Sequence, residues 1–142
     1  MDFGAVIPFV DHLGFQLHRM EDGESLLAYE AQPAHLNSFG VTHGGAVMTL
    51  MDVTMAVAAR SIEKNMGVVT IEMKTTFMRP SRGPLRAKGR LMHRTATMAF
   101  CEATITDEAG QACAHATGTF KYVPRLPVGP RGTQAFNVIS TD

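Results

Sequence analysis

The sequence predicts an α+β fold in which one curved antiparallel sheet of about six strands wraps around a single long hydrophobic helix. The first observation is the run GGAVMTLMDVTMAVAA at residues 44–59, which predicts a buried helix continuing to about residue 63. The second is a set of alternating or β-branched segments, two before this helix and four after it. The third is that short turn sequences join most neighbouring segments, and short connections are typical of antiparallel pairing.

The segments before the long helix contain a hairpin. Residues 15–21 and 24–31 flank Asp22-Gly23, and an Asp-Gly pair between two such segments is the strongest short hairpin signal. Residues 5–13 are expected to form a short amphipathic helix ahead of the hairpin. Residues 32–42 contain Pro, Asn, Ser and Gly, so they are expected to form a loop that leads into the long helix.

The segments after the helix are expected to form four strands of a meander. A long strand starts at Gly67, and alternation along it predicts two different faces. One face is expected to carry Val69, Ile71, Met73, Thr75 and Phe77, and the other Thr70, Glu72, Lys74 and Thr76. After a break at residues 79–84, rich in Pro and Gly, the remaining strands are expected at residues 85–94, 98–106 and 111–122.

Length and composition are typical of a single domain. A chain of 142 residues with 45% hydrophobic content can bury one substantial core. We expect one domain over residues 1–142, with its core at about residues 13–123 and a loosely ordered tail at residues 124–142. Cys101 and Cys113 lie in expected strands without metal-ligand spacing, so we expect them to be structural thiols.

Charge and hydropathy patterns disfavour several kinds of partner. Thirteen basic residues balance thirteen acidic ones, so no broad positive field indicates nucleic-acid binding. No segment supplies the roughly 18 uncharged apolar residues of a membrane span, and the N-terminus lacks the features of a signal peptide. The histidines show neither HxH nor HxxxH spacing, which disfavours a metal site. We therefore expect a cytoplasmic protein with no nucleic-acid, membrane or metal partner.

One acidic residue stands out. Asp52 is the only formal charge in residues 44–59. Burying a carboxylate costs free energy and raises its pKa towards neutrality, where it becomes a useful base. His43-Gly44-Gly45 comes immediately before the same helix, where backbone N–H groups at the positive end of the helix dipole form an anion site in outline.

Three motifs in this order resemble one family. They are NSFGVTHGG at residues 37–45 followed by Asp52, TTFMRP at residues 75–80, and GTF at residues 118–120. The sequence is similar to hotdog-fold acyl-CoA thioesterases of the phenylacetate-degradation (PaaI-like) type over about residues 13–123. The resemblance implies hydrolysis of a thioester to a carboxylic acid and free coenzyme A. It implies no metal or cofactor, because coenzyme A is part of the substrate.

The resemblance also implies roles for individual residues. Asp52 would be the base that activates water, or the nucleophile itself. Gly45 would donate its backbone N–H to the thioester carbonyl, and Asn37 would donate a second hydrogen bond. Thr70 matches the family's small hydroxyl near the attacking water, and His43 would hold the loop and the helix mouth together. The alternatives are a glycine kept for tight helix entry, an Asx turn at Asn37, and a simple strand residue at Thr70.

Spacing predicts that two chains build the site. Gly45 and Asp52 lie seven residues apart, about 10.5 Å along a helix, which is too far for one helix to bring both to one carbonyl carbon. A homodimer, possibly paired further into a tetramer, would bring the helix mouth of one chain to the carboxylate of the other. Gly44 is expected to contact the substrate, and Arg79 and Arg82 to meet the phosphates of coenzyme A.

Some alternatives remain open at this stage. Arg86, Lys88 and Arg90 alternate on the next strand and are either a second phosphate contact or a solvated face. A hotdog hydratase or dehydratase would need an acid–base pair, typically a histidine with a carboxylate. A non-catalytic acyl-CoA-binding module would keep the groove without needing a buried carboxylate. The sequence does not distinguish an aromatic acyl group from an aliphatic one.

Overall fold

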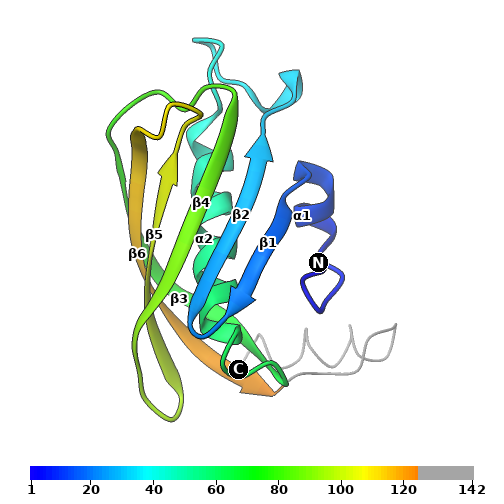
Figure 1. Cartoon of the computed structure of the whole chain (residues 1–142), viewed down its shortest axis with the longest axis vertical. Helices are drawn as coiled ribbons and strands as arrows, with labels where there is room; N and C mark the ends of the chain where they lie inside the picture. Colours follow the sequence, from blue (N-terminus) through cyan, green and yellow to red (C-terminus); the bar gives the residue numbers. More distant parts are fainter. Residues whose placement is uncertain (125–142) are drawn as a thin grey trace.

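The computed structural model describes residues 1–124 as one six-stranded antiparallel sheet that curves around one long helix (Figure 1). In chain order the elements are α1 (Pro8–Leu13), β1 (Gln16–Glu21), β2 (Glu24–Glu30), η1 (Pro33–His35), α2 (Gly44–Arg60), β3 (Met66–Phe77), β4 (Pro84–Arg94), β5 (Met98–Thr106) and β6 (Ala112–Pro124). The spatial strand order is β1-β2-β4-β5-β6-β3, so β1 and β3 form the two edges. The predicted architecture is confirmed. The expected tail at residues 124–142 lies outside the described residues from residue 125 onward.

The first hairpin forms where Asp-Gly predicted it. Asp22 and Gly23 both have positive φ, 54° and 77°, which is the requirement of a two-residue type I′ turn. The flanking residues Glu21 and Glu24 pair directly across β1 and β2. Strand β2 then pairs with β4, so the hairpin joins the meander as one continuous sheet.

Helix α2 supplies the centre of the core. Its buried side contacts the concave face of the sheet, and Leu50, Met51 and Met55 are fully buried against strand residues such as Leu27 and Phe120. Cys101 and Cys113 are buried free thiols, and burial raises the pKa of Cys101 to about 12. These two cysteines therefore act as core residues, as the sequence indicated.

Helix α2 ends at Arg60, three residues before the expected end. The Ser61 hydroxyl turns back to donate to the Ala58 carbonyl at 2.7 Å, and the Ser61 N–H also reaches this carbonyl. The Ala58 carbonyl, which would accept from the N–H of residue 62 if the helix continued, is therefore already bonded to Ser61. The Ser61 oxygen also accepts a hydrogen bond from the Gly23 N–H at 2.8 Å, which ties the helix end to the first hairpin.

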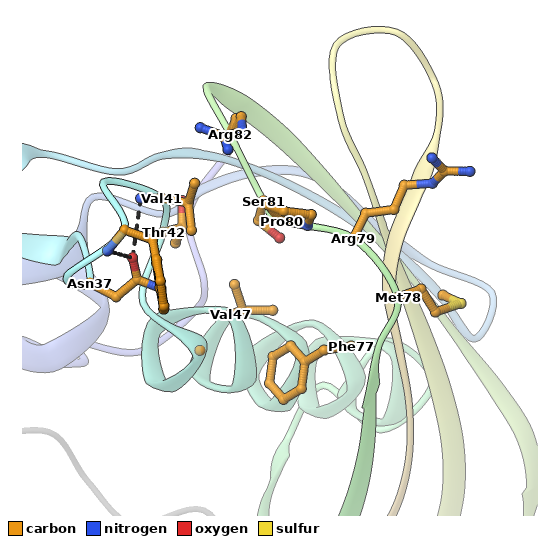
Figure 2. A pocket seen from close by; sticks show the side chains of 12 residues that line it. Asn37, Val41, Thr42, Val47, Phe77, Met78, Arg79, Pro80, Ser81 and Arg82 are labelled. Atoms are coloured by element: carbon orange, nitrogen blue, oxygen red, sulfur yellow. Dashed lines mark hydrogen bonds between the residues drawn. The ribbon is translucent and has the colours of Figure 1, made fainter.

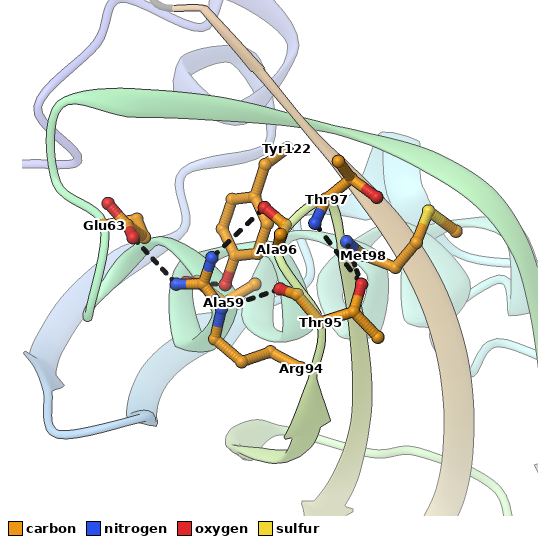
Figure 3. Close-up of polar contacts among 8 residues, drawn as sticks. All are labelled: Ala59, Glu63, Arg94, Thr95, Ala96, Thr97, Met98 and Tyr122. Atoms are coloured by element: carbon orange, nitrogen blue, oxygen red, sulfur yellow. Dashed lines mark hydrogen bonds and ion pairs between the residues drawn. The ribbon is translucent and has the colours of Figure 1, made fainter.

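A polar cluster connects the same helix end to β4 and β6 (Figure 3). Arg94 forms an ion pair with Glu63 at 2.8 Å, and its guanidinium lies 4.5 Å from the centre of the Tyr122 ring. The Tyr122 hydroxyl donates to the Ala59 carbonyl at 2.7 Å. These contacts secure one end of α2, while the opposite end, at the helix N-terminus, carries the candidate site.

Strand β3 corrects one prediction. Its pairing with β6 shifts register between Thr70 and Glu72, so Ile71 forms a bulge. Before the bulge Thr70 pairs with the buried Phe120, and after it Phe77 pairs with the buried Ala114. Thr70 therefore shares the inner face with Phe77, and Ile71 is 55% exposed. Met73, Thr75 and Phe77 share one face as predicted, but the residues before the bulge lie on the opposite side from the one predicted, because uninterrupted alternation does not allow for an inserted residue.

Candidate active site

The mouth of helix α2 is organised by His43. Its ring Nδ1 accepts a hydrogen bond from the Gly45 N–H at 2.8 Å, so His43 is the N-cap of the helix. The backbone N–H of His43 donates to the His35 carbonyl at 2.9 Å, which ties the helix mouth to the preceding loop. The predicted donor role of Gly45 conflicts with this geometry, because its N–H is already bonded to His43.

Gly44 provides the available donor at this helix end. Its N–H has no hydrogen-bond acceptor within residues 1–124. A Cβ at this position would lie 3.4 Å from Phe77 Cζ, so the glycine packs closely under that ring. The first helical N–H therefore remains free at a half-buried, side-chain-free position.

Asn37 forms the Asx turn that was the alternative reading of this residue. Its Oδ1 accepts from the N–H groups of Phe39 at 2.9 Å and Val41 at 3.2 Å (Figure 2). These two bonds fix the side-chain amide with its oxygen towards the loop backbone. The NH₂ group donates to no other described residue, so the same turn that shapes the loop leaves a donor free.

Asn37 and Gly44 belong to one open cavity of about 540 Å³, which we call the donor pocket (Figure 2). It lies between the loop before α2, the first turn of α2 and the segment that follows β3. Its walls are Asn37, Phe39, Val41, Thr42, Gly44, Val47, Phe77, Met78, Arg79, Pro80, Ser81 and Arg82. Arg79 and Arg82 are both exposed at this cavity, where they were predicted to meet anionic groups.

Asp52 lies in a second cavity of about 390 Å³, the carboxylate pocket. Its walls are Gly45, Met48, Thr49, Asp52, Thr70 and Met73. The Thr70 hydroxyl donates to Asp52 Oδ1 at 2.6 Å, from the inner face of β3 just before the bulge at Ile71. Burial raises the pKa of the Asp52 carboxyl above its ordinary value, and the hydrogen bond from Thr70 offsets part of that rise.

The two pockets share no lining residue. Within one chain, the free donors of Asn37 and Gly44 line one cavity and the carboxylate of Asp52 lines the other. Asp52 lies eight residues, about 12 Å, beyond Gly44 along the helix. One chain therefore holds its free donors and its half-buried carboxylate in two separate cavities.

The other basic candidates lie on the outer face of the sheet. Arg90 donates to Glu102 on β5 with its Nε at 2.9 Å, and Glu102 also contacts His115 on β6 at 3.1 Å. Arg86 and Lys88 are exposed on the same face of β4. Within residues 1–124, no three His, Cys, Asp or Glu side chains gather closely enough to hold a metal ion, and no helix has the length and hydropathy to cross a bilayer.

Sequence reasoning missed two residues of the carboxylate pocket. Met73 reaches it only because the bulge brings it to the face that carries Thr70, and no signal in the sequence indicated that bulge. Thr49 lies three residues before Asp52 on α2. Helical spacing alone would have placed it beside the carboxylate.

Comparisons with known proteins identify the family of this chain. The sequence model of the Thioesterase superfamily matches residues 39–114, which is more than half of the chain. A Halobacterium salinarum protein named "Putative esterase" is 31% identical over 111 residues, covering 74% of each chain. A Saccharolobus solfataricus protein of the same name is 28% identical over 117 residues, covering 82% of this chain and 83% of that one.

Solved structures share the fold. A conserved protein from Pseudomonas aeruginosa superposes with a TM-score of 0.80 and 27% identity, covering 84% of this chain and 97% of that one. The PaaI protein of the phenylacetic acid degradation operon of E. coli superposes with a TM-score of 0.76 and 20% identity, covering 81% and 83%. The sheet and central helix described above are therefore those of the hotdog fold.

Proposed function

The chain belongs to the thioesterase superfamily, and from that premise we propose that it hydrolyses acyl-CoA thioesters to a carboxylic acid and free coenzyme A. Family membership supports thioester hydrolysis in general. The acyl-CoA substrate and the roles of individual residues are our proposal.

One observation supports the catalytic role most directly: the half-buried carboxylate of Asp52 with a raised pKa. Thioester hydrolysis needs either a base that activates water or a nucleophile that water later displaces. A carboxylate whose pKa is raised is a stronger base, so it accepts a proton from water more readily. Asp52 meets the first requirement as a base and the second as a nucleophile, and both routes use the same oxygen atoms.

The carbonyl of the substrate would bind in the donor pocket. The tetrahedral intermediate carries a negative oxygen, and preorganised donors aimed at that oxygen stabilise it. The Gly44 N–H is free, lies at the positive end of the α2 dipole and shares a cavity with the free amide of Asn37. We therefore assign the carbonyl to Gly44 and Asn37, with His43 and Gly45 forming the cap that holds the helix mouth.

Two copies of the chain would complete each site. A carbonyl carbon must lie within about 3 Å of the attacking oxygen, yet Gly44 and Asp52 are about 12 Å apart along the helix. In a two-fold homodimer, the donor pocket of one protomer would face the carboxylate pocket of its partner, giving two equivalent sites. The exposed apolar residues Met48 and Phe77, at 38% and 52% exposure, fit a surface that a second copy covers.

The coenzyme A moiety would extend to the rim of the donor pocket. Arg79 and Arg82 line this cavity, and guanidinium groups suit phosphate recognition. The apolar walls contributed by Val47 and Met78 would contact the uncharged part of the substrate.

Free-thiol release from a panel of acyl-CoAs tests the proposal. Asp52→Ala should lower turnover by at least about a hundredfold without changing the oligomeric state, as expected for loss of a catalytic group. Unchanged thiol release in this variant would refute the assignment of Asp52. Hydration of an enoyl-CoA without thiol release would favour a hydratase, and binding without turnover would favour an acyl-CoA-binding module.

A further inference from the structure

The carboxylate pocket contains a hydroxyl with no role so far, that of Thr49. Residues three apart on a helix are neighbours, with about 5–6 Å between their Cβ atoms, so Thr49 lies beside Asp52. Its hydroxyl donates to the Gly45 carbonyl at 2.8 Å. A threonine hydroxyl has one hydrogen and two lone pairs. With its hydrogen already used, Thr49 can only accept a hydrogen bond from a group in the pocket.

The other polar groups of this pocket are also acceptors. Thr70 uses its hydrogen to bond Asp52 Oδ1, and Oδ2 receives no hydrogen bond from any described residue. The Gly45 N–H is bonded to His43. The remaining lining side chains are methionines. The side chains that line the carboxylate pocket therefore offer hydrogen-bond acceptors and no free donor.

A wall of acceptors selects the group that binds to it. A thioester carbonyl only accepts hydrogen bonds, so it would find no side-chain donor in this pocket, whereas the donor pocket supplies the Asn37 amide and the Gly44 N–H. A water molecule donates two hydrogen bonds. The two O–H bonds of water diverge by about 105°, so a water about 2.8 Å from each of two oxygens bridges acceptors about 4.5 Å apart, which is within reach of neighbouring side chains on one helix face.

We propose that Thr49 Oγ1 and Asp52 Oδ2 together hold the attacking water, so that Asp52 acts as a general base and Thr49 as a positioning residue. This inference rests on the proposed thioesterase activity and chooses between the two routes left open there. It also gives the two pockets complementary tasks, since one binds the carbonyl and the other binds the water that attacks it.

The chemical step balances with these groups. The water oxygen forms a bond to the carbonyl carbon while one hydrogen moves to Asp52 Oδ2 and the carbonyl π electrons move to its oxygen. The second hydrogen, held on Thr49 until then, stays with the new carboxyl group. As the carbonyl reforms, the C–S bond breaks and its electron pair leaves with sulfur. The proton on Asp52 then passes to that thiolate, which restores the base.

Three variants test the positioning role. Thr49→Val keeps the side-chain shape and removes the acceptor, so we expect kcat to fall at least about tenfold with KM changed less than about twofold. Thr49→Ser keeps the hydroxyl and should restore kcat to within about threefold of wild type. Thr54→Val is the matched control, because Thr54 makes the same bond to a carbonyl four residues back, at 2.6 Å, on the core side of α2. It should leave kcat and KM of the folded enzyme unchanged.

The same assay separates the two levels of the proposal. Suppose that wild type releases thiol. If Thr49→Val is then as fast as wild type, or Thr49→Ser is as slow as Thr49→Val, the role of Thr49 is overturned and the thioesterase assignment stays intact. No thiol release by wild type from any acyl-CoA overturns both. Circular dichroism and gel filtration of each variant distinguish a slow folded enzyme from a misfolded one.

Isotope labelling tests the choice of base over nucleophile. One turnover with excess enzyme in ¹⁸O-water should put the label in the acid product and none in the Asp52-containing peptide, because only water attacks the substrate. Label in that peptide, or an unlabelled product after the first turnover, overturns the general-base assignment, since both require attack by the carboxylate itself.

Discussion

If the donor pocket of one protomer works with the carboxylate pocket of its partner, then variants in different pockets must complement each other. Asn37→Ala removes a donor and Asp52→Ala removes the base, and each variant alone damages both sites of its homodimer. In a mixed dimer, one site combines the intact donor pocket of the Asp52→Ala chain with the intact carboxylate of the Asn37→Ala chain. The second site lacks both groups.

The expected magnitude follows from this geometry. Equal amounts of the two variants that exchange freely form about half mixed dimers, and each of these has one intact site of two. The mixture should therefore reach about a quarter of wild-type activity. Loss of one carbonyl donor typically lowers kcat by about a hundredfold to a thousandfold, and loss of the base by a similar factor. The mixture should thus exceed either parent at least about tenfold.

The assay is thiol release after the two variants are unfolded and refolded together, with different affinity tags to isolate the mixed dimers. A chain carrying both Asn37→Ala and Asp52→Ala, mixed with wild type, is the control. Its mixed dimers have no intact site under the two-chain arrangement, so about a quarter of wild-type activity remains. A site built within one chain would leave about half. Isolated mixed dimers of the single variants that are no more active than their parents would refute the reasoning.

Three further outcomes follow from the described contacts. Thr70→Val should move the acidic limb of the rate profile to higher pH, because the lost hydrogen bond had lowered the pKa of the base; an unchanged limb would contradict this. Asp52→Asn should raise the urea midpoint at about pH 7, because a carboxyl with a raised folded-state pKa costs stability when it is ionised. The gain should disappear at about pH 3, below the ordinary pKa of an aspartate, where the carboxyl is protonated in both the folded and the unfolded chain. Gly89→Ala should lower the free energy of unfolding, measured by urea denaturation, by about 1–3 kcal/mol, because its Cβ would lie 2.8 Å from the Thr54 carbonyl oxygen. Gly67→Ala is the control, because the nearest atom to its Cβ would lie 3.5 Å away.

The parts of the site that sequence predicts are those fixed by residue type and local spacing. A lone carboxylate in an apolar helix indicated Asp52 without any tertiary information, because its charge is out of place there. The position of Asn37 in a turn-rich loop before the helix indicated that its side chain makes hydrogen bonds there, either within an Asx turn or to a substrate. Spacing of seven residues between Gly45 and Asp52 argued against a single-helix site, and the two separate pockets agree with that reasoning.

The assignment of the free N–H group was beyond such reasoning. Gly44 and Gly45 are identical in type and adjacent, and both belong to the unbonded first turn of a helix. Which of them donates to His43 depends on the rotamer of that histidine and on the backbone angles of the N-cap. The loop contact from the His43 N–H to the His35 carbonyl helps fix those angles, and it forms only when the chain folds.

The bulge at Ile71 shows why the strand faces also had to be learned from the structure. The donor pocket requires Phe77 on the inner face of β3, where its ring packs over Gly44, and the carboxylate pocket requires Thr70 on that same face, where it bonds Asp52. Seven residues separate them, an odd number, and side chains an odd number apart on a regular strand point to opposite sides. A single inserted residue removes the conflict, so one edge strand lines both pockets.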